Sequence, residues 1–227
     1  MIQITLVKSD ILKAIEKAKD FDFSDNLRNR HPVVAFDNKL RGYVGEIAFE
    51  NWLKRHNVQL LKKNVLDSES GMDIDFVVQG IRQERLHIEL KTSLLPDKDG
   101  DLDQAVQNRD IKLMRRANYP IEDLHGDVHV QILFNQLRLR KEEWLRKKSS
   151  KLLRSSSSTL YQELAAHRYM RDIFMVGWID KKSLMNQINN KSESLRIWKY
   201  GQRQFWTCNL QKEAKNPLDL IKHLTKA

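Results

Sequence analysis

A chain of 227 residues is long enough to bury a hydrophobic core, and its 41% apolar and 31% charged residues are ordinary for a globular protein. Forty Lys and Arg residues against thirty Asp and Glu residues give a formal charge of +10, which favours a polyanionic partner, nucleic acid before an anionic membrane. Three further observations bear on location: no apolar run approaches the roughly 18 residues of a spanning helix, the first eight residues do not resemble a signal peptide, and Cys208 is the only cysteine. We therefore expect a cytoplasmic protein with no membrane partner, no internal disulfide and a buried thiol at Cys208.

The first quarter of the chain predicts two helices. Ser9 is typical of an N-cap, and apolar residues follow it at helical spacing over about 10–20. A second helix is predicted over about 38–56. It is apolar around more than half of its circumference, so we expect it to pack against other elements from more than one side.

The hydrophobic period then changes to that of β-strands. Segments 58–63, 72–78 and 85–91 alternate or run apolar over strand lengths, and Gly71 and Gly80 mark the turns between them. The last two segments are close enough in sequence to form a hairpin.

The rest of the chain continues as a mixture of helices and strands. Residues 141–170 are basic and helical but are interrupted by the serine run 155–158, for which a mobile loop and a linker are both open. A short helix is expected after the strand that ends near residue 179. The first predicted segments are a polar helix over 97–118, a buried strand over 127–134 and the basic helical segment over 141–170. They are followed by another buried strand over 173–179, an aromatic strand pair over 198–206 that includes Trp198 and Tyr200, and a closing helix over 218–224.

Acidic and basic residues gather in the two hairpin segments. Side chains two apart on a strand point to the same face, so Glu89 and Lys91 should emerge side by side while Ile88 and Leu90 face the core. Asp73, at the start of the preceding strand, can reach the same place. Carboxylate oxygens are ligands that Mg²⁺ prefers, and a lysine beside them can orient a metal-bound water or stabilise charge on a phosphate. The grouping suits phosphodiester hydrolysis.

An aspartate followed sixteen residues later by a Glu-x-Lys strand, Asp73 and then Glu89 to Lys91, resembles the PD-(D/E)XK nuclease superfamily. The resemblance covers about residues 38–135. It implies an α/β fold with a restriction-endonuclease-like core, in which helices flank a central mixed β-sheet. It also implies a Mg²⁺ cofactor held by Asp73 and Glu89, a catalytic Lys91, and a supporting acid on the preceding helix, a position that Glu46 matches.

The pattern departs from the family in one respect and leaves one choice open. The proline that gives the motif its name is absent, and Met72 stands in its place. Asp75 lies on the same strand face as Asp73, so either could be the metal ligand. We favour Asp73 because it is close to Gly71, at the entry to the strand.

A purely structural interpretation makes Glu89 and Lys91 a solvated strand face and the aspartates a polar hairpin edge. The other candidate residues are weaker. His125 and His129 lack the geometry of a helical zinc site, and we expect a turn histidine and a sheet histidine. His87, two residues before Glu89, is considered only as a supporting group.

A basic stretch in the second half of the chain could follow a DNA backbone or be a solvated helix face, and both interpretations are open. Its cations are opposed by only two acids, at positions 142 and 143. The basic residues are Arg138, Arg140, Lys141, Arg146, Lys147, Lys148, Lys151 and Arg154.

Within the superfamily, the length of the chain and the long region after the core are most similar to a type II restriction endonuclease. That similarity implies a homodimer that cuts both strands of a specific double-stranded DNA site, leaving 5′-phosphate and 3′-hydroxyl ends. We expect one nuclease domain over 1–227, with a catalytic core at about 38–135 and a C-terminal α+β elaboration at about 136–227 for DNA recognition or dimerisation. The alternatives are a repair, recombination or phage-defence nuclease that reads DNA structure, and a non-catalytic DNA-binding protein.

Overall fold

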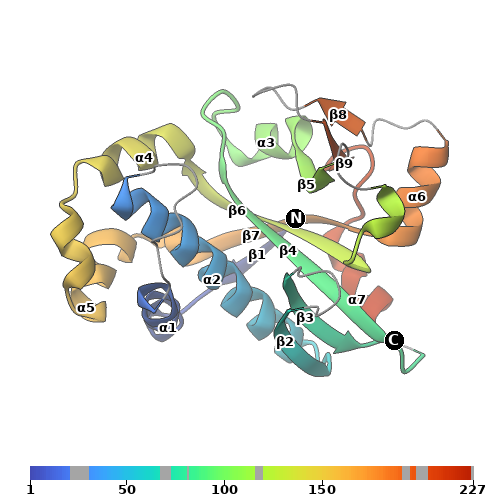
Figure 1. The fold of residues 1–227 in the computed structure, drawn as a ribbon, viewed down its shortest axis with the longest axis horizontal. Coiled ribbons are helices and arrows are strands. Elements are labelled where there is room, and N and C mark those ends of the chain that lie inside the picture. The colour runs from blue at the N-terminus through green and yellow to red at the C-terminus, as the bar shows by residue number, and fades with distance from the viewer. Residues whose placement is uncertain are drawn as a thin grey trace.

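A six-stranded mixed sheet lies at the centre of the molecule, in the order β1-β7-β6-β4-β3-β2, and helices flank it (Figure 1). A second, three-stranded sheet has the order β5-β9-β8. The mixed α/β class expected from the sequence is therefore confirmed. The structure is a computed structural model that describes residues 1–20, 31–66, 73–80, 82–115, 120–190, 195–197 and 204–225. Gly71, Met72, Trp198, Tyr200 and the side chain of Asp73 lie outside these described parts.

The chain begins with a strand that the sequence pattern did not predict. β1 (Ile2–Thr5) pairs antiparallel with β7 at one edge of the large sheet. The first helix, α1 (Lys8–Lys19), starts earlier than expected, and the proposed N-cap at Ser9 is wrong. Val7 is the N-cap residue, and the Asp10 carboxylate accepts a hydrogen bond from its backbone N–H at 3.2 Å. An acid in the first turn of the helix therefore satisfies the backbone N–H of the N-cap residue. The side chain of Ser9 is exposed.

The long helix α2 (Pro32–Arg55) begins six residues before the predicted position. A proline suits the first helical turn because its missing N–H is not needed there. The helix is buried on several sides, as expected, since it packs against α1, against the large sheet and against α4. The helix lies close to the sheet at Gly45, where an added Cβ would lie 2.3 Å from Cγ2 of Thr92.

The three strands predicted after this helix form an antiparallel meander. They are β2 (Leu60–Leu66), β3 (Asp73–Gln79) and β4 (Arg85–Leu95). The expected hairpin between the last two is confirmed, with Val78 opposite Leu86 and Phe76 opposite Ile88.

The segment after the meander corrects one prediction. Within 97–115, the described part of the segment predicted over 97–118, only α3 (Leu102–Asn108) is helical, and the chain then forms β5 (Asp110–Arg115). β5 pairs antiparallel with β9 in the small sheet, and this long-range pairing overrides the local helix-compatible pattern. The next strand, β6 (Val128–Leu137), was predicted and runs parallel to β4.

The C-terminal half adds helices at both ends of the sheet and completes both sheets. The serine run is neither a mobile loop nor a linker, because Ser156 caps α5 by accepting the N–H of Thr159 at 3.1 Å. The long helical segment expected over 141–170 is divided into α4, α5 and short irregular turns. The elements are α4 (Arg138–Arg146), α5 (Ser157–Leu160), β7 (Asp172–Asp180), α6 (Lys181–Asn189), β8 (Leu195–Ile197), β9 (Gln204–Asn209) and α7 (Leu220–Leu224).

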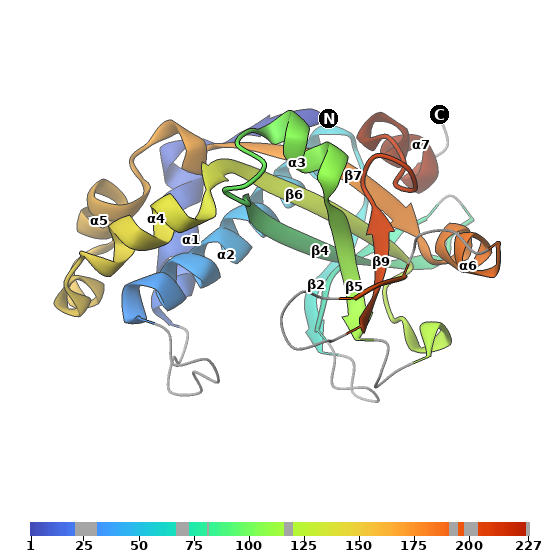
Figure 2. The same ribbon diagram turned by 90° about the horizontal axis from the view of Figure 1, so that it is seen from above.

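Two hydrophobic cores fill the two faces of the large sheet. α1, α2, α4 and α5 gather at one end of the molecule, and the small sheet and α6 lie toward the other (Figure 2). Cys208 lies in the second core and its thiol is buried, as expected. Among the helices that the structure describes, none has the length and apolar character needed to cross a membrane.

Candidate active site

The parallel strands β4 and β6 place four polar residues side by side in the middle of the large sheet. Glu89 lies opposite His129, and Lys91 lies opposite Gln131. Ile88, before Glu89, and Leu90, between Glu89 and Lys91, are buried in the first core, so the alternation expected for β4 is confirmed. Because side chains two apart share a face, the four polar residues form one compact polar group.

Glu89 is held by two hydrogen-bond donors. The Lys91 ammonium contacts one carboxylate oxygen, and Nδ1 of His129 lies 3.0 Å from the other. Burial alone raises the pKa of Glu89, but the hydrogen bond from His129 and the charge of Lys91 outweigh it and lower the pKa to about 2. Glu89 is therefore a fixed anion at neutral pH, although its side chain is only 21% exposed.

His129 is completely buried behind Glu89. Its Nε2 lies 3.0 Å from the carbonyl oxygen of Gly126, and its Nδ1 faces the Glu89 carboxylate. Both ring nitrogens therefore face oxygen atoms of neighbouring groups. Gly126 makes room for the ring, because an added Cβ there would lie 2.7 Å from Cε1 of His129 and 3.3 Å from Cβ of Glu89.

Gln131 fixes the backbone beneath the lysine. Its side chain is 3% exposed, and its amide nitrogen donates to the carbonyl oxygens of Lys91 at 3.0 Å and of Ile132 at 2.8 Å. A buried amide that joins β4 to β6 limits how far the Lys91 backbone can shift.

Asp75 is the second carboxylate of the group. The paired residues of β3 and β4 end at Phe76 and Ile88, and just beyond them an Asp75 oxygen accepts the backbone N–H of Leu90 at 2.6 Å. Burial is the largest cause that raises the pKa of Asp75, and the charges of Glu46 and Glu89 act in the same direction. The hydrogen bond from Leu90 and the charge of Lys91 oppose them, and the resulting pKa is about 6. Glu46 and Glu89 thus both lie within electrostatic reach of Asp75.

Glu46 reaches this neighbourhood from α2. Its side chain is 18% exposed, and Lys17 of α1 lies 4.0 Å from one of its oxygens. The preceding residue, Gly45, lies close against Thr92 of β4, so the position of Glu46 depends on that contact. The structure therefore brings the predicted Glu46, Glu89 and Lys91 into one electrostatic group.

The structure does not place the side chain of the favoured Asp73. Its backbone begins β3, opposite Leu66 of β2, and the side chain lies outside the described residues. Among the described residues, no three His, Cys, Asp or Glu side chains are close enough together to hold a metal ion as they stand. Asp75, the alternative within the pair, is the aspartate that the described contacts connect to Glu89 and Lys91.

Sequence reasoning assigned the histidines incompletely. His87 points toward Asp127, with Nδ1 3.8 Å from a carboxylate oxygen, and not toward Glu89. His129 is a sheet histidine, as expected, yet it also contacts Glu89. Its signal was available in the sequence pattern, because His129 and Gln131 are polar residues two apart in the otherwise apolar first seven residues of β6, all of which are buried. Their relation to Glu89 and Lys91 appears only once the register of β6 against β4 is known.

The arrangement is an anionic carboxylate, a second buried carboxylate of raised pKa, a third acid nearby and a lysine, all on or beside the central strands. Such a group can bind a cation, orient a water molecule and stabilise negative charge on a substrate. Comparison of the chain with protein-family models, curated proteins and solved structures finds no match to any of them, so its function has to be argued from this geometry.

Proposed function

We propose that the protein is a Mg²⁺-dependent endonuclease that hydrolyses phosphodiester bonds in double-stranded DNA. The observation that carries the proposal is the convergence of Asp75, Glu89 and Lys91 at the end of the β3–β4 hairpin. The formal charge of +10 supports a nucleic-acid substrate because DNA is a dense polyanion.

The order of the elements also supports a PD-(D/E)XK assignment. A helix that carries Glu46 precedes the meander, the meander carries the aspartates and then Glu89 and Lys91, and the strand order is mixed. This is the arrangement that the resemblance implies for a restriction-endonuclease-like core. In this interpretation β7, from the C-terminal elaboration, extends the same sheet as the core.

The residues fit a hard divalent cation. Carboxylate oxygens are the donors that Mg²⁺ prefers, and a cation would offset both the burial of Asp75 and the charges of Glu46 and Glu89, which together raise its pKa. Glu89 and one of the aspartates, Asp73 or Asp75, would hold the ion, with Glu46 adding negative charge. When bound, Mg²⁺ lowers the pKa of a coordinated water and offsets charge on the phosphate.

The protein's own groups supply orientation and charge. Lys91 lies against Glu89 and places a compact ammonium where it can donate to an attacking water or to a phosphate oxygen. His129 holds the other Glu89 oxygen from behind, so the carboxylate cannot rotate freely. Hydrogen bonds of this kind orient metal-binding carboxylates in other sites.

The proposal is tested by incubating supercoiled plasmid DNA with the purified protein and following nicked and linear products with and without Mg²⁺. We expect cleavage that requires Mg²⁺ and is abolished in Glu89→Ala, because that change removes a metal ligand. DNA binding should persist in Glu89→Ala, since loss of an acid reduces repulsion from phosphate. Glu143→Ala, an exposed acid on α4, is the matched control and should cleave normally. Cleavage by Glu89→Ala at the wild-type rate would reject the site, and binding without cleavage by the wild type would favour a non-catalytic DNA-binding protein.

The choice between the two aspartates is tested by the same assay. Asparagine keeps the shape of aspartate and removes its charge, so Asp73→Asn and Asp75→Asn separate ligation from packing. The contacts of Asp75 with Leu90 and with the charges of Glu46, Glu89 and Lys91 lead us to expect that Asp75→Asn is inactive. Full activity of Asp75→Asn with an inactive Asp73→Asn would assign the ligand to Asp73.

A further inference from the structure

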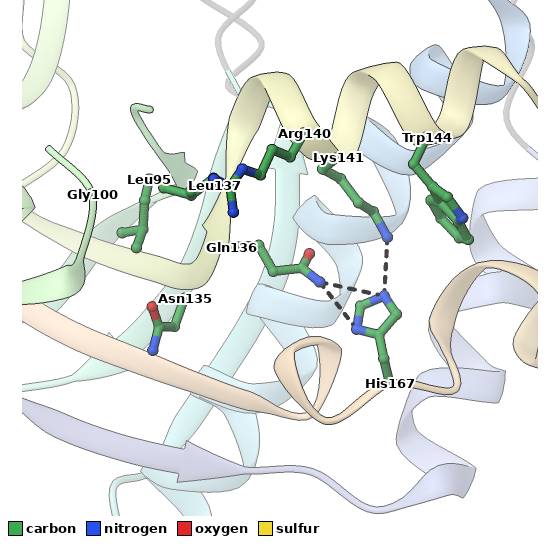
Figure 3. A pocket seen from close by; sticks show the side chains of 9 residues that line it. All are labelled: Leu95, Gly100, Asn135, Gln136, Leu137, Arg140, Lys141, Trp144 and His167. Atoms are coloured by element: carbon green, nitrogen blue, oxygen red, sulfur yellow. Dashed lines mark hydrogen bonds between the residues drawn. The ribbon is translucent and has the colours of Figure 1, made fainter. Parts of the chain in front are cut away.

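A cavity of about 430 Å³ lies at the carboxyl ends of the parallel strands, beyond the residues of the candidate active site (Figure 3). Leu95 ends β4 and Leu137 ends β6, and both line the cavity. In open α/β sheets, ligands bind beyond the carboxyl ends of parallel strands, and small-molecule sites have volumes of about 300–1,000 Å³. The remaining lining residues are Gly100, Asn135, Gln136, Arg140, Lys141, Trp144 and His167.

The lining carries positive charge and no acid. Arg140 and Lys141 both line the cavity from α4, and Figure 3 shows the Arg140 side chain extending from this helix toward Leu137. Within the described part of the chain, no carboxylate forms an ion pair with Arg140. Asp97 lies close to the start of α4, but its carboxylate accepts the backbone N–H of Leu139 at 2.8 Å and does not line the cavity. The Arg140 guanidinium is thus available to an anion.

Lys141 adds a buried cation that is only partly balanced. It is 7% exposed, and its ammonium lies 3.6 Å from Oδ1 of Asp37, too far for a hydrogen bond. The other Asp37 oxygen accepts from Nε of Arg41 at 2.9 Å. One buried carboxylate is therefore shared by two buried cations. Burial lowers the pKa of Lys141, and the charges of Arg41 and Lys148 lower it further, while Asp37 opposes them. An anion in the cavity would relieve this imbalance.

His167 and Gln136 complete the polar wall. Burial, and then the charge of Lys141, lowers the pKa of His167 to about 4, so its ring is neutral at pH 7. A neutral ring accepts at Nε2 from Lys141, 3.0 Å away, and carries its proton on Nδ1. Nδ1 faces the amide of Gln136, whose buried oxygen has no hydrogen-bond partner. Figure 3 shows the side-chain nitrogen of Gln136 facing His167. The oxygen and nitrogen of a glutamine amide are similar in shape, and rotating this amide by half a turn places the oxygen, an acceptor, opposite the Nδ1–H of His167. The NH₂ group of Gln136 then points away from His167.

The remaining lining residues that bear on a ligand are two leucines and a tryptophan. Leu95 and Leu137 are apolar, and Trp144 is 37% exposed although it is a large apolar residue. The ammoniums of Lys141 and Lys148 lie 4.5 and 4.9 Å from the centroid of the Trp144 ring, so the exposed part of the indole is the surface left for a ligand. A guanidinium fork and amide donors beside an aromatic face suit a phosphate ester that carries a planar ring.

We propose that this cavity binds a nucleoside monophosphate unit, with the phosphate on Arg140 and the base against Trp144. The unit is either a free nucleotide or the terminal 5′-phosphorylated nucleotide of a nucleic-acid strand, since both present the same chemistry. The proposal does not require nuclease activity, because the cavity shares no lining residue with the candidate active site.

The test is calorimetric titration of the full chain, free of divalent metal, with deoxyadenosine 5′-monophosphate, deoxyadenosine and inorganic phosphate. We expect saturable binding of the monophosphate, with weaker binding of the nucleoside and of phosphate alone. Arg140→Gln should weaken monophosphate binding roughly tenfold or more, the size expected for a lost charge-assisted hydrogen bond. Arg146→Gln, an exposed arginine of the same helix outside the cavity, is the matched control and should bind as the wild type does.

A second comparison identifies the source of the nucleotide. If a 5′-phosphorylated trinucleotide binds more tightly than the free monophosphate and loses affinity in Arg140→Gln, the cavity takes a strand end. If the free monophosphate binds at least as well, the cavity takes a free nucleotide. The proposal is overturned if no ligand binds saturably, if deoxyadenosine binds as tightly as its monophosphate, or if Arg146→Gln weakens binding as much as Arg140→Gln does. Binding that is lost in Glu89→Ala would place the nucleotide at the candidate active site and would equally overturn it.

Discussion

At the scale of single residues, the contact between His129 and Glu89 is the feature that sequence reasoning did not find. A fully buried histidine holds one oxygen of the carboxylate, and Lys91 holds the other. The pair also depends on a third position, because only a glycine at 126 leaves space for the ring next to Glu89. His129 therefore orients Glu89 without itself meeting the substrate.

We predict that His129→Leu lowers Mg²⁺-dependent cleavage roughly 10- to 100-fold, the range found when a partner of a metal-binding residue is lost. His129→Gln, which keeps an amide donor, should retain more activity than His129→Leu. The measurement is the cleavage rate as a function of Mg²⁺ concentration. If Glu89 loses its orientation, the Mg²⁺ concentration for half-maximal rate rises, whereas partial unfolding only lowers the maximal rate. An unchanged Mg²⁺ dependence in His129→Leu would remove His129 from the site.

Asp75 gives a prediction about stability. Its pKa is about 6 in the folded protein and close to 3.8 in an unfolded chain, so the unfolded chain releases this proton at lower pH. The cost of ionising Asp75 in the fold is therefore absent below about pH 4, grows as the pH rises and is complete above about pH 6. A difference of about two pKa units corresponds to an upper limit of about 3 kcal/mol.

We predict that Asp75→Asn is more stable than the wild type at pH 8 in metal-free solution, and that the difference disappears near pH 4. Urea unfolding at the two pH values measures it. Asp123→Asn, an exposed aspartate, is the control and should change stability by no more than about 0.5 kcal/mol at either pH. Added Mg²⁺ should stabilise the wild type at pH 8 but not Asp75→Asn, if Asp75 is the ligand. Equal stability of Asp75→Asn and wild type at pH 8 would show that Asp75 is not buried as described.

At the scale of secondary-structure elements, the contact of α2 with β4 connects the fold to the site. Gly45 lets the helix approach Thr92, and Glu46 follows directly on the same helix. Gly42, one turn earlier, has no atom within 4 Å of an added Cβ. The two glycines therefore form a natural pair of test positions within one helix.

We predict opposite effects for the two alanine substitutions. Gly42→Ala should raise the free energy of unfolding by up to about 1 kcal/mol, because alanine favours the helix and fits the available space. Gly45→Ala should lower it by roughly 1–3 kcal/mol, because its methyl group would overlap the stiff Thr92 side chain. Urea unfolding measures both. Gly45→Ala should also cleave DNA more slowly than Gly42→Ala, since moving α2 moves Glu46, and equal cleavage by the two variants would separate Glu46 from catalysis.

The elements also show what the sequence could predict. β3, β4, β6 and β7 were predictable because buried or half-buried strands have a local hydrophobic pattern. β1 and β5 were not, because each is short or polar and forms through pairing with a strand far along the chain. The residues of the candidate site also fall into those that a local pattern predicts and those that depend on long-range pairing. Glu89 and Lys91 follow from alternation within one strand, whereas the contact with His129 depends on the register between β4 and β6, which no local pattern reports.

At the scale of the whole molecule, the charge and the C-terminal region give a prediction about substrate. We predict that the protein cuts duplex DNA at a defined sequence as a homodimer, because a two-fold dimer presents identical sites to antiparallel strands. A large sequenced plasmid is digested with Mg²⁺ and the fragment ends are sequenced, and sedimentation gives the oligomeric state. Discrete fragments that share one short symmetric sequence support the prediction. A smear, or cutting confined to branched or flapped DNA, would favour the repair, recombination or phage-defence alternative.

The pairing of β1 with β7 has a consequence for how the protein is made. Ile2 pairs with Met175 and Thr5 pairs with Asp172, so β1 cannot pair until a segment about 170 residues later in the chain has been synthesised. At ribosomal rates of about 5–20 residues per second, that partner emerges roughly ten to thirty seconds after β1. Throughout this interval the large sheet lacks β7, which is the strand that lies between β1 and β6. Completion of the sheet is therefore a late step of folding, and β1 is among the last of its strands to be paired although it is synthesised before the other five.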